Sequence, residues 1–277
     1  MLLIGLTGSI ATGKSTVSSI LSSPPYSLPI IDADQLARIV VAPGTSGYDK
    51  IVSYFGPSTP DLLLDEPGKP LNRPALGRRV FGMSEERKRD RAVLNGIVHP
   101  AVRWEMYRRL VSAYLRGERA VVLDVPLLFE SGLDSLCGVV VVVSVTDPAT
   151  QMKRLMARDD HLTKEDAQNR VVSQGDVREK ARRCLARNGD GAGEEVTAGA
   201  VGGPRGYVLY NDTDIPALKG QIRDVWSKIA GDSPRWWAWL LLLCPPLAGS
   251  AAALTYWRNK KLNEGWTNGE LVRKAKL

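Results

Sequence analysis

Residues 8–15 read GSIATGKS and have the spacing G-x-x-x-x-G-K-[ST] of a phosphate-binding loop. In such a loop, consecutive backbone N–H groups form a concave nest for phosphate oxygens, and Gly8 and Gly13 let the chain turn closely. Lys14 supplies a positive charge for the β- and γ-phosphates, and Ser15 supplies a hydroxyl ligand for Mg²⁺. We therefore expect ATP and Mg²⁺ as cofactors, with nucleotide contacts from Gly8, Ser9, Ile10, Ala11, Thr12, Gly13, Lys14, Ser15 and Thr16.

Two aspartates stand where a second strand is expected to end. Asp32 and Asp34 follow the apolar residues 29–31, and the carboxyl edge of a parallel sheet is where α/β proteins bind ligands. Either carboxylate has the chemistry to orient or deprotonate an acceptor hydroxyl during phosphoryl transfer. One of the two has an alternative role as the N-cap of the following helix.

Residues 148–180 carry several lysines and arginines. Arg154 and Arg158 lie one helical turn apart, while Thr163 and Asp166 have the spacing of a helix N-terminus. Two short charged helices suit a lid whose cations neutralise the transferring phosphoryl group and exclude water. The alternative is an ordinary solvated helix face.

These residues need a scaffold, and the chain predicts one. Short apolar runs alternate with helical patterns, and the runs cover residues 2–7, 29–31, 120–125, 138–145 and 207–210. This alternation predicts an α/β fold with a parallel sheet flanked by helices. The glycine-rich loop then follows a strand and opens a helix, as a phosphate-binding loop requires. The chain contains no N-K-x-D stretch, so a guanine-specific enzyme is not indicated.

Two segments interrupt the alternation. Residues 43–115 contain a proline- and glycine-rich half and a helical half, so we expect a helical insert there, with Pro100 opening a helix; a structural cap before Pro100 is one alternative for His99. Residues 188–206 are rich in glycine and poor in large apolar side chains, so we expect a disordered insertion.

Composition narrows the classes of partner. The chain is 44% apolar and 24% charged, which is ordinary for a globular protein. Of the net charge of +7, +5 belongs to residues 235–277, and the rest of the chain is nearly neutral. A nucleic-acid-binding surface is therefore not predicted for the main body. The three cysteines lie far apart and have no metal-binding spacing.

The C-terminal segment has a different composition from the body. Residues 236–257 contain no charged side chain, carry aromatic residues at both ends, and precede a basic tail over residues 258–277. A helix of this length matches the thickness of a bilayer core, so we expect a transmembrane segment. Alternatives are a buried core helix, a membrane-surface segment, or a re-entrant hairpin, because Pro245 and Pro246 break a straight helix.

The chain resembles the dephospho-CoA kinase family. The resemblance is carried by GLTGSIATGKST, IIDADQLAR, VVAPGTSGY, LNRPALGRRVF, LNGIVHP, VPLLFE and RLMARD, in that order. It implies a kinase domain over residues 1–232, with an acceptor-binding insert at about 43–115 and a lid at about 148–180.

The resemblance also implies ATP-dependent phosphorylation of the ribose 3′-hydroxyl of dephospho-CoA. By the family pattern Asp34 is the better candidate for the base, Arg154 and Arg158 are lid cations, and Asp32, Arg38 and His99 lie toward the acceptor. Another small-molecule kinase of this fold and a membrane-tethered nucleotide-binding scaffold are the alternatives. We expect the enzyme to be anchored in a membrane with its kinase domain in the cytosol, at either the mitochondrial outer membrane or the endoplasmic reticulum.

Overall fold

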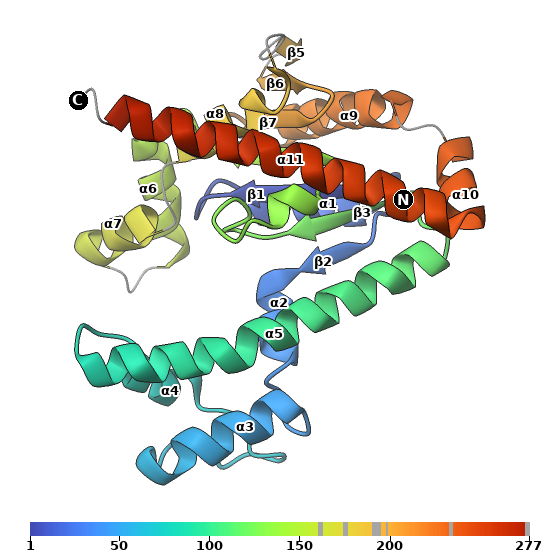
Figure 1. Ribbon diagram of the computed structural model, residues 1–277. Coiled ribbons are helices and arrows are strands. Elements are labelled where there is room, and N and C mark those ends of the chain that lie inside the picture. Colours follow the sequence, from blue (N-terminus) through green and yellow to red (C-terminus); the bar gives the residue numbers. More distant parts are fainter. Residues whose placement is uncertain (160–162, 174–176, 190–194, 198, 233–234, 275–277) are drawn as a thin grey trace. The chain divides into compact units, whose positions relative to one another are not determined.

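The structure is a computed structural model that describes residues 1–159, 163–189, 195–197, 199–232 and 235–274, except for 174–176. The chain forms two compact units, one from Met1–Ile30 and Ala113–Leu277 and the other from Ile31–Ser112. Figure 1 labels the elements of both units.

The chain forms a seven-stranded sheet in the order β2-β3-β1-β4-β7-β6-β5, and all its strands except most of β2 belong to the first unit. Its strands are β1 (Leu2–Gly8), β2 (Ile30–Asp32), β3 (Ala120–Asp124), β4 (Val139–Ser144), β5 (Glu195–Thr197), β6 (Ala200–Gly203) and β7 (Gly206–Tyr210). β1 pairs in parallel with β3 and β4, and β4 pairs in parallel with β7. The predicted α/β class is confirmed, and the sheet is mostly parallel, with antiparallel pairing of β6 to its two neighbours. The central strands β3 and β4 are buried and almost wholly apolar because helices cover both faces of a sheet of this kind.

The helices of this unit are α1 (Lys14–Ser22), α6 (Pro148–Arg158), α7 (Lys164–Ser173), α8 (Val177–Ala186), α9 (Ile215–Asp232), α10 (Arg235–Leu243) and α11 (Pro245–Lys274), with a 3₁₀ turn η2 (Leu133–Leu136). α1 and α9 contribute Val17, Leu21, Leu218 and Ile222 to a core with β1, β4 and β7. The Cys184 thiol of α8 donates to backbone oxygens of β4 and β7, at 3.4 Å from both the Val140 and the Tyr207 oxygen. This framework holds the carboxyl ends of β1, β3 and β4 as one edge.

The second unit is helical. It contains α2 (Ala33–Ile39), α3 (Ser46–Phe55), a 3₁₀ turn η1 (Gly56–Ser58), α4 (Arg73–Val80) and most of α5 (Glu85–Leu115). Its core includes Ile51, Phe55, Leu71 and Val80. Pro100 lies inside α5 and does not open a helix, so the alternative that His99 is a structural cap is wrong. The donor that Pro100 lacks would have paired with the carbonyl of Gly96, and the helix continues past this one missing bond.

The segment at 188–206 differs from its expectation, because β5 and β6 lie in it and β6 pairs antiparallel with β7. The Asn188 side chain stabilises the turn between β6 and β7, because its Oδ1 accepts hydrogen bonds from the Arg205 and Gly206 amides at 3.0 and 2.9 Å. A Cβ at Gly202 would lie 2.5 Å from the Gly206 oxygen, so glycine here permits close strand pairing. Residues 190–194 and 198 of the expected disordered insertion lie outside the described residues.

The C-terminal segment also departs from its expectation. Within the described ranges, no single helix is long and apolar enough to cross a membrane; α10 and α11 pass that test only as a pair, bent by 112°. The break falls before Pro245, because proline disfavours helical geometry in the residue preceding it and suits the first position of a new helix.

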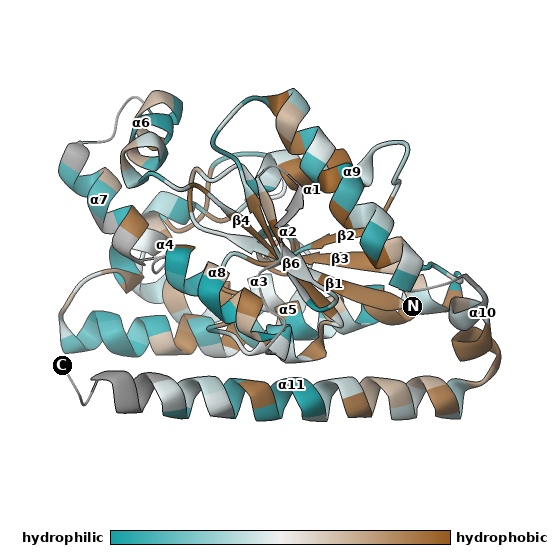
Figure 2. Cartoon of the chain, turned by 90° about the horizontal axis from the view of Figure 1, so that it is seen from above, coloured by the Kyte–Doolittle hydropathy of each residue, from teal (hydrophilic) through white to brown (hydrophobic). Residues whose placement is uncertain are grey.

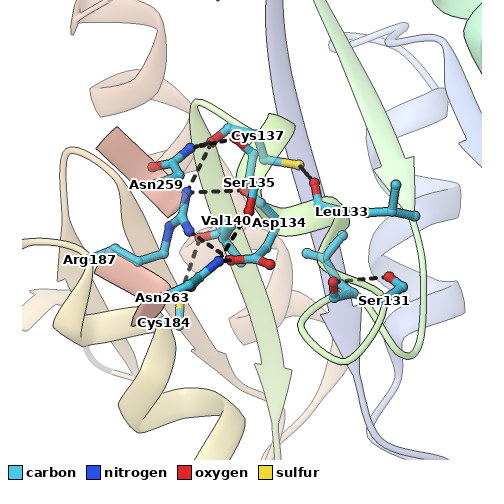
Figure 3. A network of polar contacts seen from close by, with 11 residues as sticks. Ser131, Leu133, Asp134, Ser135, Cys137, Val140, Cys184, Arg187, Asn259 and Asn263 are labelled. Carbon is cyan, nitrogen blue, oxygen red and sulfur yellow. Dashed lines mark hydrogen bonds and ion pairs between the residues drawn. The ribbon is translucent and has the colours of Figure 1, made fainter. Parts of the chain in front are cut away.

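α11 is also packed on the body. Asn259 donates to the carbonyls of Ser135 and Cys137 at 3.0 and 2.9 Å, and Asn263 donates to Asp134 Oδ2 at 2.9 Å (Figure 3). Asp134 is fully buried and also pairs with Arg187 at 3.1 Å. The tail therefore forms part of the first unit.

Candidate active site

The phosphate-binding loop connects β1 to α1 as predicted. Gly8 ends β1, and a Cβ there would lie 2.7 Å from the Val143 oxygen of β4. Gly13 is the N-cap of α1 with φ of 93°, which favours glycine. Ala11 also has a positive φ, 60°, although it carries a Cβ. Holding alanine in this region requires contacts from the surrounding structure.

Two side chains from outside the loop supply such contacts. Gln151 of α6 is buried and donates to the Ile10 carbonyl at 2.8 Å. Asn211, just after β7, donates to the Thr12 carbonyl at 2.9 Å. Because C=O and N–H point oppositely across a trans peptide, these bonds leave the N–H groups of Ala11 and Gly13 directed away from Gln151 and Asn211. Backbone N–H groups arranged in this way can receive phosphate oxygens.

Lys14 lies at the first position of α1, and its ammonium donates to the carboxylate of Asp124. Asp124 is only 2% exposed and ends β3, beside β1 in the sheet. In phosphate-loop enzymes, a strand-end aspartate and the loop Ser/Thr hold Mg²⁺. The chemistry of Asp124 and of the exposed Ser15 hydroxyl fits such an ion. Among the described residues, no three or more His, Cys, Asp or Glu side chains are grouped so that they could hold a metal ion.

The sequence analysis missed Asp124, Gln151 and Asn211. The signal for Asp124 was present, since it is the one acidic residue in the apolar run 120–125. Gln151 and Asn211 carry no local signal, because each acts through a partner more than 100 positions away in the chain.

The two lid arginines have different surroundings. Arg154 donates to the Asn211 carbonyl at 2.7 Å, so it lies beside the loop. Arg158 pairs instead with Asp159, at 3.1 Å, and this hydrogen bond raises the pKa of its guanidinium. The expected N-terminus at Thr163 is confirmed, since its hydroxyl accepts from the Asp166 amide at 3.1 Å. Of the two predicted cations, the structure brings only Arg154 to the loop.

A cavity of about 590 Å³ opens next to these groups. Arg154 and Asn211 contribute to its wall, together with the loop and the start of α9; the lining residues are Ala11, Gly13, Thr16, Arg154, Asn211, Thr213, Asp214, Ile215, Pro216 and Leu218. Ligand sites commonly have this size and this mixture of apolar wall and a few polar groups. The cavity adjoins the phosphate loop, so it can take the rest of a nucleotide.

The remaining predicted residues belong to the helical unit. Asp32 is the N-cap of α2, and its Oδ1 accepts from the amides of Asp34 and Gln35 at 2.8 and 3.0 Å. Asp34 and Arg38 are exposed and lie one turn apart on α2, and His99 is exposed on α5. The capping alternative thus applies to Asp32, and the Asp34 carboxylate is accessible for chemistry.

Comparisons with known proteins give a consistent picture. The family model for dephospho-CoA kinase matches residues 2–188. Dephospho-CoA kinase CAB5 of Saccharomyces cerevisiae is 45% identical over 229 residues, covering 83% of this chain and 83% of that protein. The uncharacterised protein C14G10.01 of Schizosaccharomyces pombe is 39% identical over 94% of this chain and 96% of its own, so that match extends into the C-terminal segment. The solved dephospho-CoA kinase from Campylobacter jejuni is 25% identical with a TM-score of 0.57, covering 84% of this chain and 98% of that chain.

Proposed function

The chain belongs to the dephospho-CoA kinase family, and from this premise we propose how its residues divide the work of phosphoryl transfer. The reaction moves the γ-phosphoryl group of ATP to the ribose 3′-hydroxyl of dephospho-CoA, the last step of coenzyme A synthesis. The observation that carries the assignment is the family match over residues 2–188, which includes the phosphate loop.

The loop binds the polyphosphate of ATP. Backbone N–H groups of residues 8–15 and the Lys14 ammonium receive the β- and γ-phosphates, with Ser9, Ile10 and Thr16 as further loop contacts. Ser15 and Asp124 would hold Mg²⁺, which would supply charge neutralisation at the phosphate oxygens. The adjoining cavity beside Asn211 takes the nucleoside.

Asp34 acts on the acceptor. Its carboxylate accepts the proton of the 3′-hydroxyl as that oxygen forms a bond to the γ-phosphorus and ADP leaves. Asp32, Arg38 and His99 contribute to the acceptor side. Arg154 neutralises charge on the transferring group, and Arg158 joins it when the lid closes, exchanging its pair with Asp159 for the phosphates.

Residues 236–257 attach the enzyme to a membrane. In this proposal the kinase domain faces the cytosol, at the mitochondrial outer membrane or the endoplasmic reticulum. Support comes from the lack of charge in this segment and from its exposed apolar side chains, among them Trp236, Trp239 and Leu243.

A product assay tests the residue roles. The full chain is incubated with ATP, Mg²⁺ and dephospho-CoA, and coenzyme A is quantified by mass spectrometry. Asp34→Asn should lower kcat by roughly 10²-fold with little change in ATP affinity. Asp32→Asn is the matched control: because asparagine also caps helices, it should leave the melting temperature nearly unchanged, with a smaller effect on kcat. If Asp34→Asn keeps kcat within threefold while Asp32→Asn abolishes transfer, the base is Asp32.

A further inference from the structure

One face of α10 is apolar and uncovered. Trp236, Trp239, Leu240 and Leu243 recur at helical spacing, and Leu243 at the end of the helix is 80% exposed. These positions form a single stripe, because residues three and four apart lie on one side of a helix. In a water-soluble helix such a stripe normally faces a core. Here the described part of the chain leaves it open.

α11 presents one face to the body and another to solvent. Its inward side carries Asn259, only 2% exposed, and Asn263. Its outward side carries Leu254, Trp257 and Lys261, with the Lys261 ammonium 5.5 Å from the centre of the Trp257 ring. Figure 2 shows that, along these two helices, the hydrophobic colouring lies mostly in α10 and in the adjoining half of α11.

Hydrogen bonds attach both α10 and α11 to the first unit. At one end the Tyr114 hydroxyl donates to the Leu241 carbonyl at 2.6 Å, and the Leu241 side chain is buried. At the other end Asn259 makes two hydrogen bonds to the loop around η2. Between these fastenings the pair bends by 112°. A segment held at Leu241 and at Asn259 cannot extend as a straight span of about 20 residues through a hydrocarbon core.

We infer that α10 and α11, together with the bend between them, lie flat in the surface of a lipid bilayer rather than crossing it; we call this bent pair the elbow. This inference rests on the proposed membrane attachment and specifies its mode. The apolar stripe of α10 and the outward face of α11 enter the headgroup region, where Trp and Tyr rings are favoured.

The exposed charges of α11 indicate which lipid headgroups the bilayer should contain. Arg258, Lys260 and Lys261 are exposed next to the aromatic side chains, and Glu264 is the one exposed acid among the α11 side chains that the structure describes. Basic side chains beside an apolar helix face attract anionic lipid headgroups. The partner is therefore a membrane surface that contains anionic lipid. In this arrangement the C-terminus and the kinase domain stay on the same side of the bilayer.

The chain carries its own reporter for the test. Cys244 sits at the elbow and is partly exposed, while Cys137 and Cys184 are fully buried and burial raises the pKa of each thiol to about 12. A thiol-reactive fluorophore added to the folded protein should therefore label Cys244 selectively. The depth of the attached fluorophore in the bilayer is then measured with lipids that carry quenchers at different positions along the acyl chain.

The experiment uses the full labelled chain and vesicles of phosphatidylcholine with or without 30% phosphatidylserine. We expect binding that is stronger to the anionic vesicles, and quenching that is strongest from shallow labels, about 5–10 Å below the headgroups. Trp239→Glu with Leu243→Glu should weaken vesicle binding about tenfold or more while kcat stays within twofold of the parent. Trp104→Glu, which alters an exposed tryptophan outside the elbow, should leave vesicle binding unchanged.

Three results would overturn the inference. Quenching strongest from the bilayer centre, with a C-terminal tag protected from protease in sealed vesicles, means that the segment spans; attachment then stands and only its mode is wrong. Failure to bind any vesicle by a chain that is monomeric and active removes the attachment itself and leaves the kinase assignment intact. A dimer in solution that the double substitution dissociates assigns the stripe to a second copy of the chain.

Discussion

Gln151 offers the sharpest test of how the phosphate loop is held. Its amide fastens the Ile10 carbonyl from α6, next to Ala11 with its positive φ. Gln151→Met keeps the length of the side chain and removes the donor. The variant should still fold, because the remaining α6 contacts are retained, but Ala11 should leave its strained conformation in a larger fraction of molecules.

The size of the effect follows from the lost bond. Removing one partner of a partly buried hydrogen bond costs about 1–2 kcal/mol. If all of it appears as loss of the ATP-competent loop, the KM for ATP rises about 5- to 30-fold. The KM for dephospho-CoA should stay within twofold, because the acceptor does not depend on this loop carbonyl.

The assay is steady-state kinetics with each substrate varied in turn, together with a thermal melt. Asn259→Leu is the control, since it also removes a buried amide that donates to backbone carbonyls, but far from the loop. It should lower the melting temperature and leave the KM for ATP unchanged. A Gln151→Met enzyme with the parent KM for ATP would refute the idea that α6 sets the loop geometry.

Further predictions concern the loop, the helical unit and the tail. Lys14→Ala should abolish measurable transfer in the kinetic assay, and because it removes the cation that pairs with the buried Asp124 carboxylate, calorimetry should also show a lower melting temperature. Gly13→Ala places a Cβ 2.2 Å from the Asn211 amide nitrogen at a positive φ, so ATP binding measured by titration calorimetry should weaken about tenfold or more. Hydrogen bonds from two arginines lower the pKa of Glu105 to about 2 from 4.5. Its stabilising contribution is therefore complete above pH 4.5 and is lost as the pH falls toward 2, so the melting-temperature difference between the parent and Glu105→Gln should shrink over that interval. Ending the chain after Asp232 removes the tail contacts around η2, so the melting temperature should fall clearly below that of the full chain; an unchanged value would show that the tail packing adds no stability.

The sequence predicted what depends on local spacing. The phosphate loop was recognisable because residues 8–15 carry the glycines, the lysine and the serine of the motif between an apolar strand and a helix. The sheet class followed from the apolar runs, and the helix start at Thr163 followed from a short-range cap. In each case the sequence signal lies within a few residues, even where the contacts that complete the structure do not.

The failures share a different cause. The contacts of Gln151 and Asn211 with the loop, and of Asn259 with η2, join parts of the chain that sequence spacing does not relate. Glycine content misled in the segment that contains β6, because low apolar bulk accompanies both disorder and close strand pairing. Composition likewise predicted that residues 236–257 suit lipid, and Pro245 and Pro246 indicated the break in the helix, but nothing in the sequence revealed the hydrogen bonds at Leu241 and Asn259 that attach both helices to the first unit.

The hairpin of β5 and β6 also affects how the molecule behaves at high concentration. β7 has five residues that are mostly buried and apolar, and without β6 its unpaired N–H and C=O groups would form the margin of the sheet. Open margins of that kind recruit strands from other molecules and lead to aggregation. With the hairpin in place the sheet ends in β5 on one side and β2 on the other, each only three residues long. The β5–β6 hairpin thus covers the edge of β7, and we expect it to keep the sheets of different molecules from associating.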